Sequence, residues 1–254
     1  MKYSVSSELA ERIEVGYTLF SDYKIGQKLS IDTGFLSENE VKLLTTTPLR
    51  KIPLELIASY VSEVDSEKMS VNEMRYFLPR MLELLAHRHI LYISEELSLS
   101  KCRFDAKNHW KESEIRFLQA YAETFFEDEL DREHIDFVSA VNWLICFGLS
   151  GLDIQPLLRI WTQKASELTA IWHFWELHNG IFVSNNSVFY CNYAENHPTL
   201  NDEVTRWLND VSVLKAFRKG IENQLFSEQE LNAGVLYHLE NLHSVLEKKL
   251  SKSS

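Results

Sequence analysis

Glycine and proline are scarce in this sequence, which has only eight glycines and five prolines in 254 residues. Because these two residues supply many of the conformations that tight turns need, the chain is expected to have few turns. Few turns favour long helices over many short strands. Cysteine is also rare: Cys102, Cys146 and Cys191 are widely spaced, and no C-x-x-C pair occurs. We therefore expect no disulfide framework, no conventional zinc site and a cytoplasmic location.

Long apolar runs are absent too. No stretch of 18 uncharged apolar residues occurs, and the longest apolar concentration, Phe137 to Leu149, is too short to span a bilayer. Residues Met1 to Ile13 carry Glu8 and Glu11 and lack the apolar core of a signal peptide. These absences predict a soluble chain with no membrane partner.

Positive charge is in deficit, with 26 basic against 37 acidic residues and a net charge of −11. Such a balance repels nucleic acid and anionic lipid, so neither is an expected partner. A basic protein partner is compatible with it, but simple solubility is the favoured explanation.

Signatures of catalysis are missing. The chain has no G-x-S-x-G elbow, no G-x-G-x-x-G or Walker A loop, and no H-E-x-x-H. Glu240 and His243 form one E-x-x-H pair, whereas a di-iron bundle needs two. We predict no metal, no cofactor and no catalytic residue.

Helical periodicity dominates what is present. Ser37 to Glu40, Ser70 to Glu73 and Ser227 to Glu230 have the S-x-x-E spacing of a capping box, and each precedes an apolar-periodic run. The second box opens the most regular stripe, which continues to about Arg88 with Pro79 inside it. Proline removes an amide donor, so it predicts either a kink or the start of a separate helix.

Further helices are expected over the remaining apolar-periodic segments. Those with both ends assigned are 9–20, 54–64, 91–97, 110–126, 135–147, 168–178 and 228–250. Three more are expected to begin at Asp153, with Pro156 in the first turn, at about residue 201 and at about residue 212. Segment 135–147 is apolar almost all round, as in a buried central helix. Asn179-Gly180 is expected to end its helix in the left-handed conformation. Ile181 to Tyr193 alone has strand character, typical of a small hairpin.

The predicted fold class is therefore all-α, with one helical domain over residues 1–254. The architecture is either a multi-helix bundle or an irregular α-solenoid, with a small hairpin near 181–193.

Two passages resemble a family of uncharacterised bacterial proteins. The matching residues are Thr47-Pro48-Leu49-Arg50, then Tyr76 to Leu84 with its FLPR-x-LEL string, then Lys101, Trp110 and Glu114. The resemblance covers about residues 17–126 and implies a bacterial, cytoplasmic, helical protein without an assigned activity. Members of that family often carry a cysteine cluster before the PLR segment. This chain has no cysteine in Gln27 to Phe35, so a metal or redox function of such a cluster is not expected.

Two groups of charged residues are candidate sites. An acidic turn is predicted from Glu127, Asp128, Glu129, Asp131 and Glu133; it is either a solvated loop or a surface for a basic partner. Calcium binding is disfavoured because the turn lacks the required spacing and glycine. Arg80, beside Pro79 on an apolar helix, either ties that helix to a neighbouring loop alongside Arg50 or binds an anion.

Aromatic side chains also concentrate between Trp172 and Tyr190, where core packing is expected and an aromatic-rimmed groove is the alternative.

Three functions remain open. The favoured hypothesis is a non-enzymatic interaction protein, most specifically a bacterial immunity protein that neutralises a cognate toxin, such as a basic one, by binding it. The alternatives are a helical enzyme with a carboxylate/His site drawn from the acidic turn or from Glu240 and His243, and a scaffold or adaptor protein.

Overall fold

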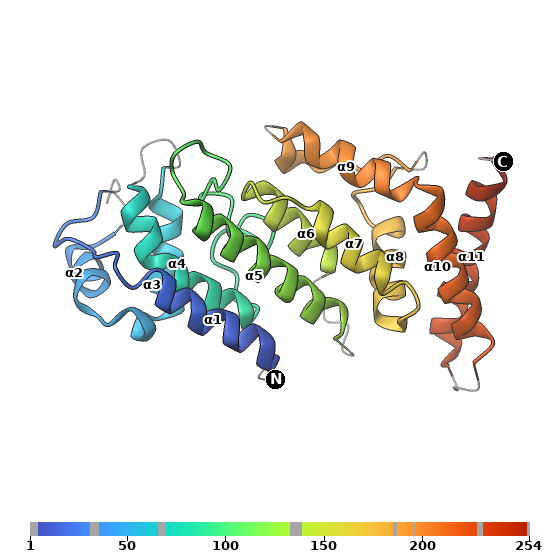
Figure 1. Cartoon of the computed structure of the whole chain (residues 1–254), viewed down its shortest axis with the longest axis horizontal. Coiled ribbons are helices and arrows are strands. Elements are labelled where there is room, and N and C mark those ends of the chain that lie inside the picture. The colour runs from blue at the N-terminus through green and yellow to red at the C-terminus, as the bar shows by residue number, and fades with distance from the viewer. Residues whose placement is uncertain are drawn as a thin grey trace. The chain divides into compact units, whose positions relative to one another are not determined.

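The computed structural model describes residues 5–30, 36–65, 70–132, 139–184, 187–195, 197–227 and 231–252. Within these ranges it holds eleven α-helices, two short 3₁₀ helices and no strand, so the all-α fold class is confirmed (Figure 1). Not one of the described helices has the length and apolar character needed to cross a membrane.

The chain divides into two compact units. The first unit comprises residues 1–128 and 146–153, and the second comprises residues 129–145 and 154–254. Each is described by itself below. The single domain expected over residues 1–254 stays a prediction, because the division into compact units does not test it.

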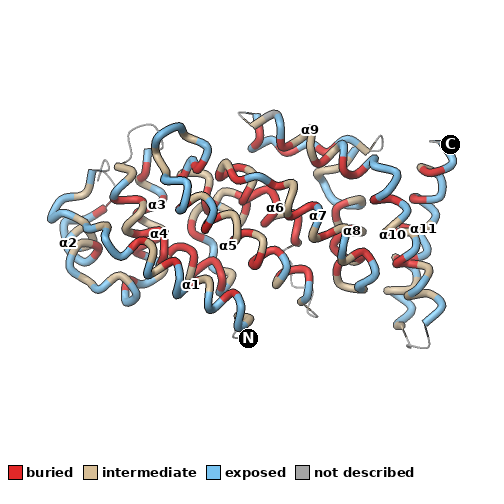
Figure 2. Tube along the Cα trace, in the orientation of Figure 1, coloured by how far each residue is buried: buried red, intermediate tan, exposed pale blue. Residues whose placement is uncertain are grey.

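Helix α4 lies at the centre of the first unit. This unit contains α1 (Ser7–Leu19), α2 (Glu38–Thr46), η1 (Leu49–Lys51), α3 (Leu54–Glu63), α4 (Val71–Ala86) and most of α5 (Glu112–Leu130). Helices α1, α3 and η1 pack against α4, and α2 packs against α3. The predicted apolar stripe of α4 is confirmed, because all its members are at most 1% exposed: Met74, Phe77, Leu78, Met81, Leu82 and Leu85. Figure 2 shows this buried side as red on the tube.

Pro79 lies inside α4, and the helix continues through it to Ala86. The proline therefore does not start a separate helix. The predicted weak helix at 91–97 is wrong: these residues form bends and turns within an irregular segment between α4 and α5. Ser98 stabilises them, because its Oγ accepts from the Leu91 amide at 3.1 Å and donates to the Ser94 carbonyl at 3.1 Å. A seven-residue segment with only four apolar residues is too short to offset the cost of helix nucleation unaided.

Helix α10 is the centre of the second unit. Besides the end of α5, this unit contains most of α6 (Ala140–Leu149), then α7 (Gln155–Gln163), α8 (Leu168–Asn179), η2 (Asn192–Ala194), α9 (Pro198–Leu208), α10 (Val211–Leu225) and α11 (Ala233–Lys252). Helices α7, α8, α9 and α11 all contact α10 (Figure 1). Phe174 of α8 stacks on Phe217 of α10, with ring centroids 3.7 Å apart. Eight of the ten residues of α6 are buried, as predicted for an apolar helix, and residues 135–138 of the predicted segment lie outside the described residues.

Helix starts were predicted with mixed success. Ser37 and Glu40 form the expected reciprocal capping box. Ser70 accepts from the Glu73 amide, but the Glu73 carboxylate binds Ser30 instead, at 2.9 Å from its amide and 2.6 Å from its hydroxyl. That box is therefore half formed, because a tertiary partner replaces the local one.

Three other helix ends differ from expectation. Asp153 does not cap α7, which follows Ile154 without a side-chain cap; Pro156 does lie in its first turn. Gly180 is extended, with φ −79° and ψ 176°, so the predicted left-handed ending is wrong. Helix α11 starts at Ala233, where Asn232 Oδ1 accepts from the Val235 amide at 2.9 Å. The third predicted box falls partly on residues 228–230, which lie outside the described residues.

The predicted hairpin at 181–193 is reduced to one isolated antiparallel bridge between Val183 and Phe189. Residues 185 and 186, at its expected turn, lie outside the described residues. The Phe189 amide donates to Thr205 Oγ1 of α9 at 2.9 Å. A bond to α9 thus takes the place of a longer strand ladder, as expected for a segment too short to form a stable hairpin alone.

Candidate functional site

The predicted acidic turn is largely helical and paired. Glu127, Asp128 and Glu129 lie in the last turn of α5, Asp131 follows it, and Glu133 lies outside the described residues. This corrects the expectation of a solvated acidic loop. Asp128 accepts from Arg88 Nη2 at 2.9 Å, with the two side chains 10% and 5% exposed.

The neighbouring carboxylates also have cationic partners. Glu129 is 4% exposed and lies 3.5 Å from Arg132 Nε. Asp131 accepts from Lys164 Nζ at 2.5 Å. Glu127 is the exposed member of the three carboxylates in the last turn of α5. Most of the predicted partner-binding charge is therefore used within the protein.

Arg50 and Arg80 meet around two shared residues, Tyr17 and Glu83. Arg80 donates from Nε to the Ile52 carbonyl at 2.9 Å and from Nη1 to Glu83 Oε2 at 2.6 Å. The Tyr17 hydroxyl donates to the same Glu83 oxygen at 2.7 Å. Burial, reinforced by Glu83, raises the pKa of Tyr17 above its ordinary value.

The Arg50 guanidinium lies 4.0 Å above the Tyr17 ring centroid and pairs with Glu14 of α1. Arg80 thus ties α4 to the segment after η1, as the structural interpretation of both arginines expects. Each arginine has protein partners in place of an external anion.

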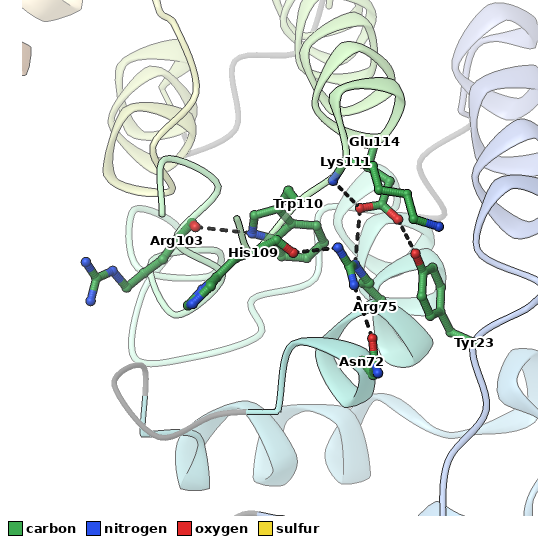
Figure 3. A network of polar contacts seen from close by, with 8 residues as sticks. All are labelled: Tyr23, Asn72, Arg75, Arg103, His109, Trp110, Lys111 and Glu114. Carbon is green, nitrogen blue, oxygen red and sulfur yellow. Dashed lines mark hydrogen bonds and ion pairs between the residues drawn. The ribbon is translucent and has the colours of Figure 1, made fainter. Parts of the chain in front are cut away.

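A third network, which sequence reasoning missed, joins α4 to α5 (Figure 3). Glu114 is 1% exposed, although it lies in the first turn of α5. Its Oε1 accepts from the Tyr23 hydroxyl, and its Oε2 accepts from Arg75 Nε at 3.1 Å and from the Lys111 amide at 2.8 Å. Both oxygens of this carboxylate are therefore engaged within the protein.

Arg75 extends the network into the irregular segment before α5. Its Nη2 donates to the His109 carbonyl at 2.6 Å and its Nη1 to Asn72 Oδ1 at 3.1 Å. Trp110 Nε1 in turn donates to the Arg103 carbonyl at 3.1 Å (Figure 3). In the sequence, Trp110 and Glu114 stood out only as part of the resemblance, and Arg75 only as an arginine bordering the apolar stripe of α4. The network fixes the irregular segment before α5 against α4.

His178 of the second unit lies in an apolar, electropositive position. Its Nδ1 faces the Phe174 carbonyl at 3.0 Å, and its Nε2 faces Lys249 Nζ of α11 at 3.2 Å. Burial, and next the charge of Lys249, lowers the pKa of His178 to about 4. Burial lowers the pKa of Lys249 to about 8.

Stability is expected to fall as the pH is lowered from 6.5 to 4. The pKa of His178 is about 4 in the folded protein against about 6.5 in an unfolded chain, so in this window the unfolded state binds a proton that the folded state does not. The expected loss is about 3 kcal/mol. Urea unfolding of wild type and His178→Gln across this range measures it. Because the carboxylates contribute equally to both proteins, parallel pH profiles would contradict the assignment.

The aromatic side chains between Trp172 and Tyr190 lie partly in the core and partly at the surface. Phe174 and Phe189 are buried, whereas Tyr190 is 55% exposed. Trp172 and Trp175 pack on each other at 5.1 Å and against His238 of α11, which lies 4.1 Å from Trp175. These tryptophans therefore pack mainly between helices.

Two grooves open on the second unit. The first encloses about 490 Å³ between α7, α9 and the start of α10, and Arg159, Arg206 and Trp207 are among its lining residues. The second encloses about 680 Å³ between α10 and the end of α11, and its lining includes Lys215 and Lys248. These grooves could not be predicted from sequence, because each combines side chains from separate helices.

Among the described residues, no three or more His, Cys, Asp or Glu side chains are grouped to hold a metal ion. His243, proposed with Glu240 as an enzymatic pair, instead lies 3.2 Å from Glu222 of α10.

Comparison with protein-family models, with curated proteins and with solved structures finds no match. The resemblance built on the PLR and FLPR-x-LEL segments therefore stays a prediction.

Proposed function

We propose that this chain is a non-enzymatic binding protein, most specifically a bacterial immunity protein that neutralises a toxin by occluding it. The observation that carries the proposal is a contrast in where charge is used. Buried ionic side chains close on one another, as Glu114 does with Arg75 and Asp128 with Arg88. The two grooves of the second unit, by contrast, open to solvent and carry charged side chains.

Recognition needs a rigid, complementary surface, and the hydrogen bond from Trp207 Nε1 of α9 to Thr162 Oγ1 of α7 holds two walls of the first groove together. Open grooves with a polar rim and a buried aromatic supply the surface. An active site would instead place an ionisable group with spare hydrogen-bonding capacity in such a groove.

Co-expression tests the proposal. The chain is produced together with the product of the gene directly upstream of its own, and bacterial growth is followed. The upstream product is expected to arrest growth by itself, and this chain is expected to restore it. Size-exclusion chromatography of the purified pair should show a stable complex. A harmless upstream product, or a toxic one that forms no complex, would contradict the immunity function.

A charge-reversal variant tests whether the predicted acidic residues form the interface. Glu127 is an exposed acidic residue in the last turn of α5, so Glu127→Lys reverses a surface charge there. Glu38→Lys is the matched control, because it changes the net charge equally at an exposed position on another helix, α2. Loss of rescue in Glu127→Lys alone would assign the interface to the predicted acidic residues.

A further inference from the structure

From the two grooves we infer a specific binding surface: the face around the first turn of α10 binds an acidic, partly apolar segment of the partner protein. This inference deepens the proposed function, on which it rests for the partner being a protein. It also assigns the partner's contact segment a negative charge, opposite to the one suggested by the net charge of the chain.

The grooves lie on either side of one helical turn. Val211 lines the second groove, whereas the next two residues of α10, Ser212 and Val213, line the first. The start of α10 therefore separates the two grooves, which both border its first turn. Val211, at this position, is 39% exposed.

Cationic side chains predominate on this face. Five line the two grooves, against three carboxylates; the cations are Arg159, Arg206, Lys215, Arg218 and Lys248, and the carboxylates are Glu203, Asp210 and Glu247. One carboxylate, Asp210, is used locally, because it caps α10 by accepting from the Ser212 amide at 2.7 Å. The hydrogen bonds that Asp210 accepts, above all the one from the Ser212 hydroxyl, hold the pKa of its carboxyl below the ordinary value.

Four of the five cations are available to pair with carboxylates of a partner. Within the described part of the chain, no carboxylate forms an ion pair with Arg159, Arg206, Lys215 or Lys248. Arg218 differs, since it pairs with Glu222 at 3.3 Å. Elsewhere in the protein the arginines of the described networks have partners, so unpaired arginines on two neighbouring helices stand out. Arginine binds carboxylates through a planar fork of donors.

The floor of the first groove is apolar and held in place. Trp207 is 8% exposed, and its Nε1 donates to Thr162 Oγ1 of α7 at 2.9 Å. Leu158, 1% exposed, lies beside it among the lining residues. An apolar side chain of the partner fits on this floor while neighbouring carboxylates reach the arginines at the rim. Tryptophan and arginine, both present in this groove, are enriched in binding hot spots.

A protein segment suits this face better than nucleic acid. A polynucleotide presents a long series of phosphates and depends on an extended positive field. This chain carries a net charge of −11, so a long polyanion meets repulsion beyond the local patch. A short acidic segment interacts mainly within one screening length, about 8 Å at physiological salt. The local excess of cations therefore determines what binds.

Fluorescence anisotropy with three labelled probes tests the inference on the full chain. The probes are a short peptide alternating glutamate and leucine, the same peptide with lysine in place of glutamate, and a short single-stranded oligonucleotide. The glutamate peptide is expected to bind most tightly, and its affinity should fall as salt is raised. Tighter binding of the lysine peptide or of the oligonucleotide would overturn the inference.

Charge reversal locates the site. Arg159→Glu/Arg206→Glu changes the first groove, and Lys215→Glu/Lys248→Glu changes the second. Lys42→Glu/Lys219→Glu is the control, because it alters the net charge equally at exposed positions that do not line either groove. Each groove variant should lose about tenfold or more in affinity for the glutamate peptide, and the control less than about twofold. Equal losses in all three variants would show a diffuse charge effect and contradict the site.

An NMR titration of the wild-type chain tests the same site without depending on whether the variants fold. The indole N–H of Trp207 is expected to shift in the NMR spectrum as the glutamate peptide is added, while that of buried Trp143 on α6 stays in place. An unmoved Trp207 resonance would remove the first groove from the site. The two proposals fail separately: absence of growth rescue leaves peptide binding intact, and absence of peptide binding leaves rescue intact.

Discussion

Replacing Glu114 with alanine is expected to lower the free energy of unfolding of the first unit by about 3–5 kcal/mol. The carboxylate is 1% exposed, and it pairs with Arg75, whose side chain is 12% exposed. Its loss leaves a largely buried guanidinium without its counter-charge and the Tyr23 hydroxyl without its acceptor. Breaking one side of a buried pair costs more than the pair itself contributes.

Urea denaturation followed by circular dichroism measures this loss. Hydrogen–deuterium exchange adds a local readout, since residues 87–111 should exchange faster when Arg75 no longer holds the His109 carbonyl. Glu112→Ala is the matched control on the same helix, because Glu112 is 83% exposed and pairs only with exposed Arg116. That change should cost less than about 0.5 kcal/mol.

A second variant separates charge from packing. Arg75→Met/Glu114→Ala removes the stranded guanidinium as well, so it should be more stable than Glu114→Ala alone. If the double variant is the less stable of the two, the penalty does not arise from an unpaired buried charge.

Gly220→Ala is expected to destabilise the second unit by about 3 kcal/mol or more. A Cβ at this position would lie 1.8 Å from the carbonyl oxygen of Ala165, just after α7, and 2.7 Å from its carbonyl carbon. These are backbone atoms, so no side-chain rotation relieves the overlap. Helix propensity alone predicts the opposite sign, a gain of up to about 1 kcal/mol for alanine over glycine. The sign of the change therefore decides whether α10 approaches Ala165 this closely.

Thermal and urea unfolding, with hydrogen exchange in α10, check this result. Gly26→Ala is the control, since the nearest atom to its added Cβ is the Lys28 carbonyl oxygen at an ordinary 3.6 Å. It should change stability by less than about 0.5 kcal/mol. A Gly220→Ala protein as stable as wild type would refute the close contact.

Local chemistry explains which sequence predictions succeeded. The stripe of α4 and the box from Ser37 to Glu40 depend on residues three or four apart. Such spacings are set by helix geometry, so they can be recognised before the fold is known. The same logic failed at 91–97, where the apolar run was short, and at Asp153, where the cap was plausible but unused.

Partner choice between distant residues explains the failures at the candidate sites. The acidic residues near the end of α5 look like one surface in the sequence. In the structure Asp128 pairs with Arg88, 40 residues earlier, and Asp131 with Lys164, 33 residues later. Glu114 reaches Tyr23 across 91 residues. Nothing within one helical turn of these carboxylates indicates such partners.

Local patterns in the chain were enough to show that it is helical, where most helices lie and which of their faces are apolar, because backbone hydrogen bonding and side-chain periodicity act over one or two turns. Which charges are exposed depends instead on how distant segments pack. An ionic side chain is neutralised or left available according to what packing brings within a few ångströms of it. Packing buried Asp128 against Arg88 and left Arg159 and Arg206 lining an open groove, and it thereby moved the proposed binding surface from the acidic to the basic residues.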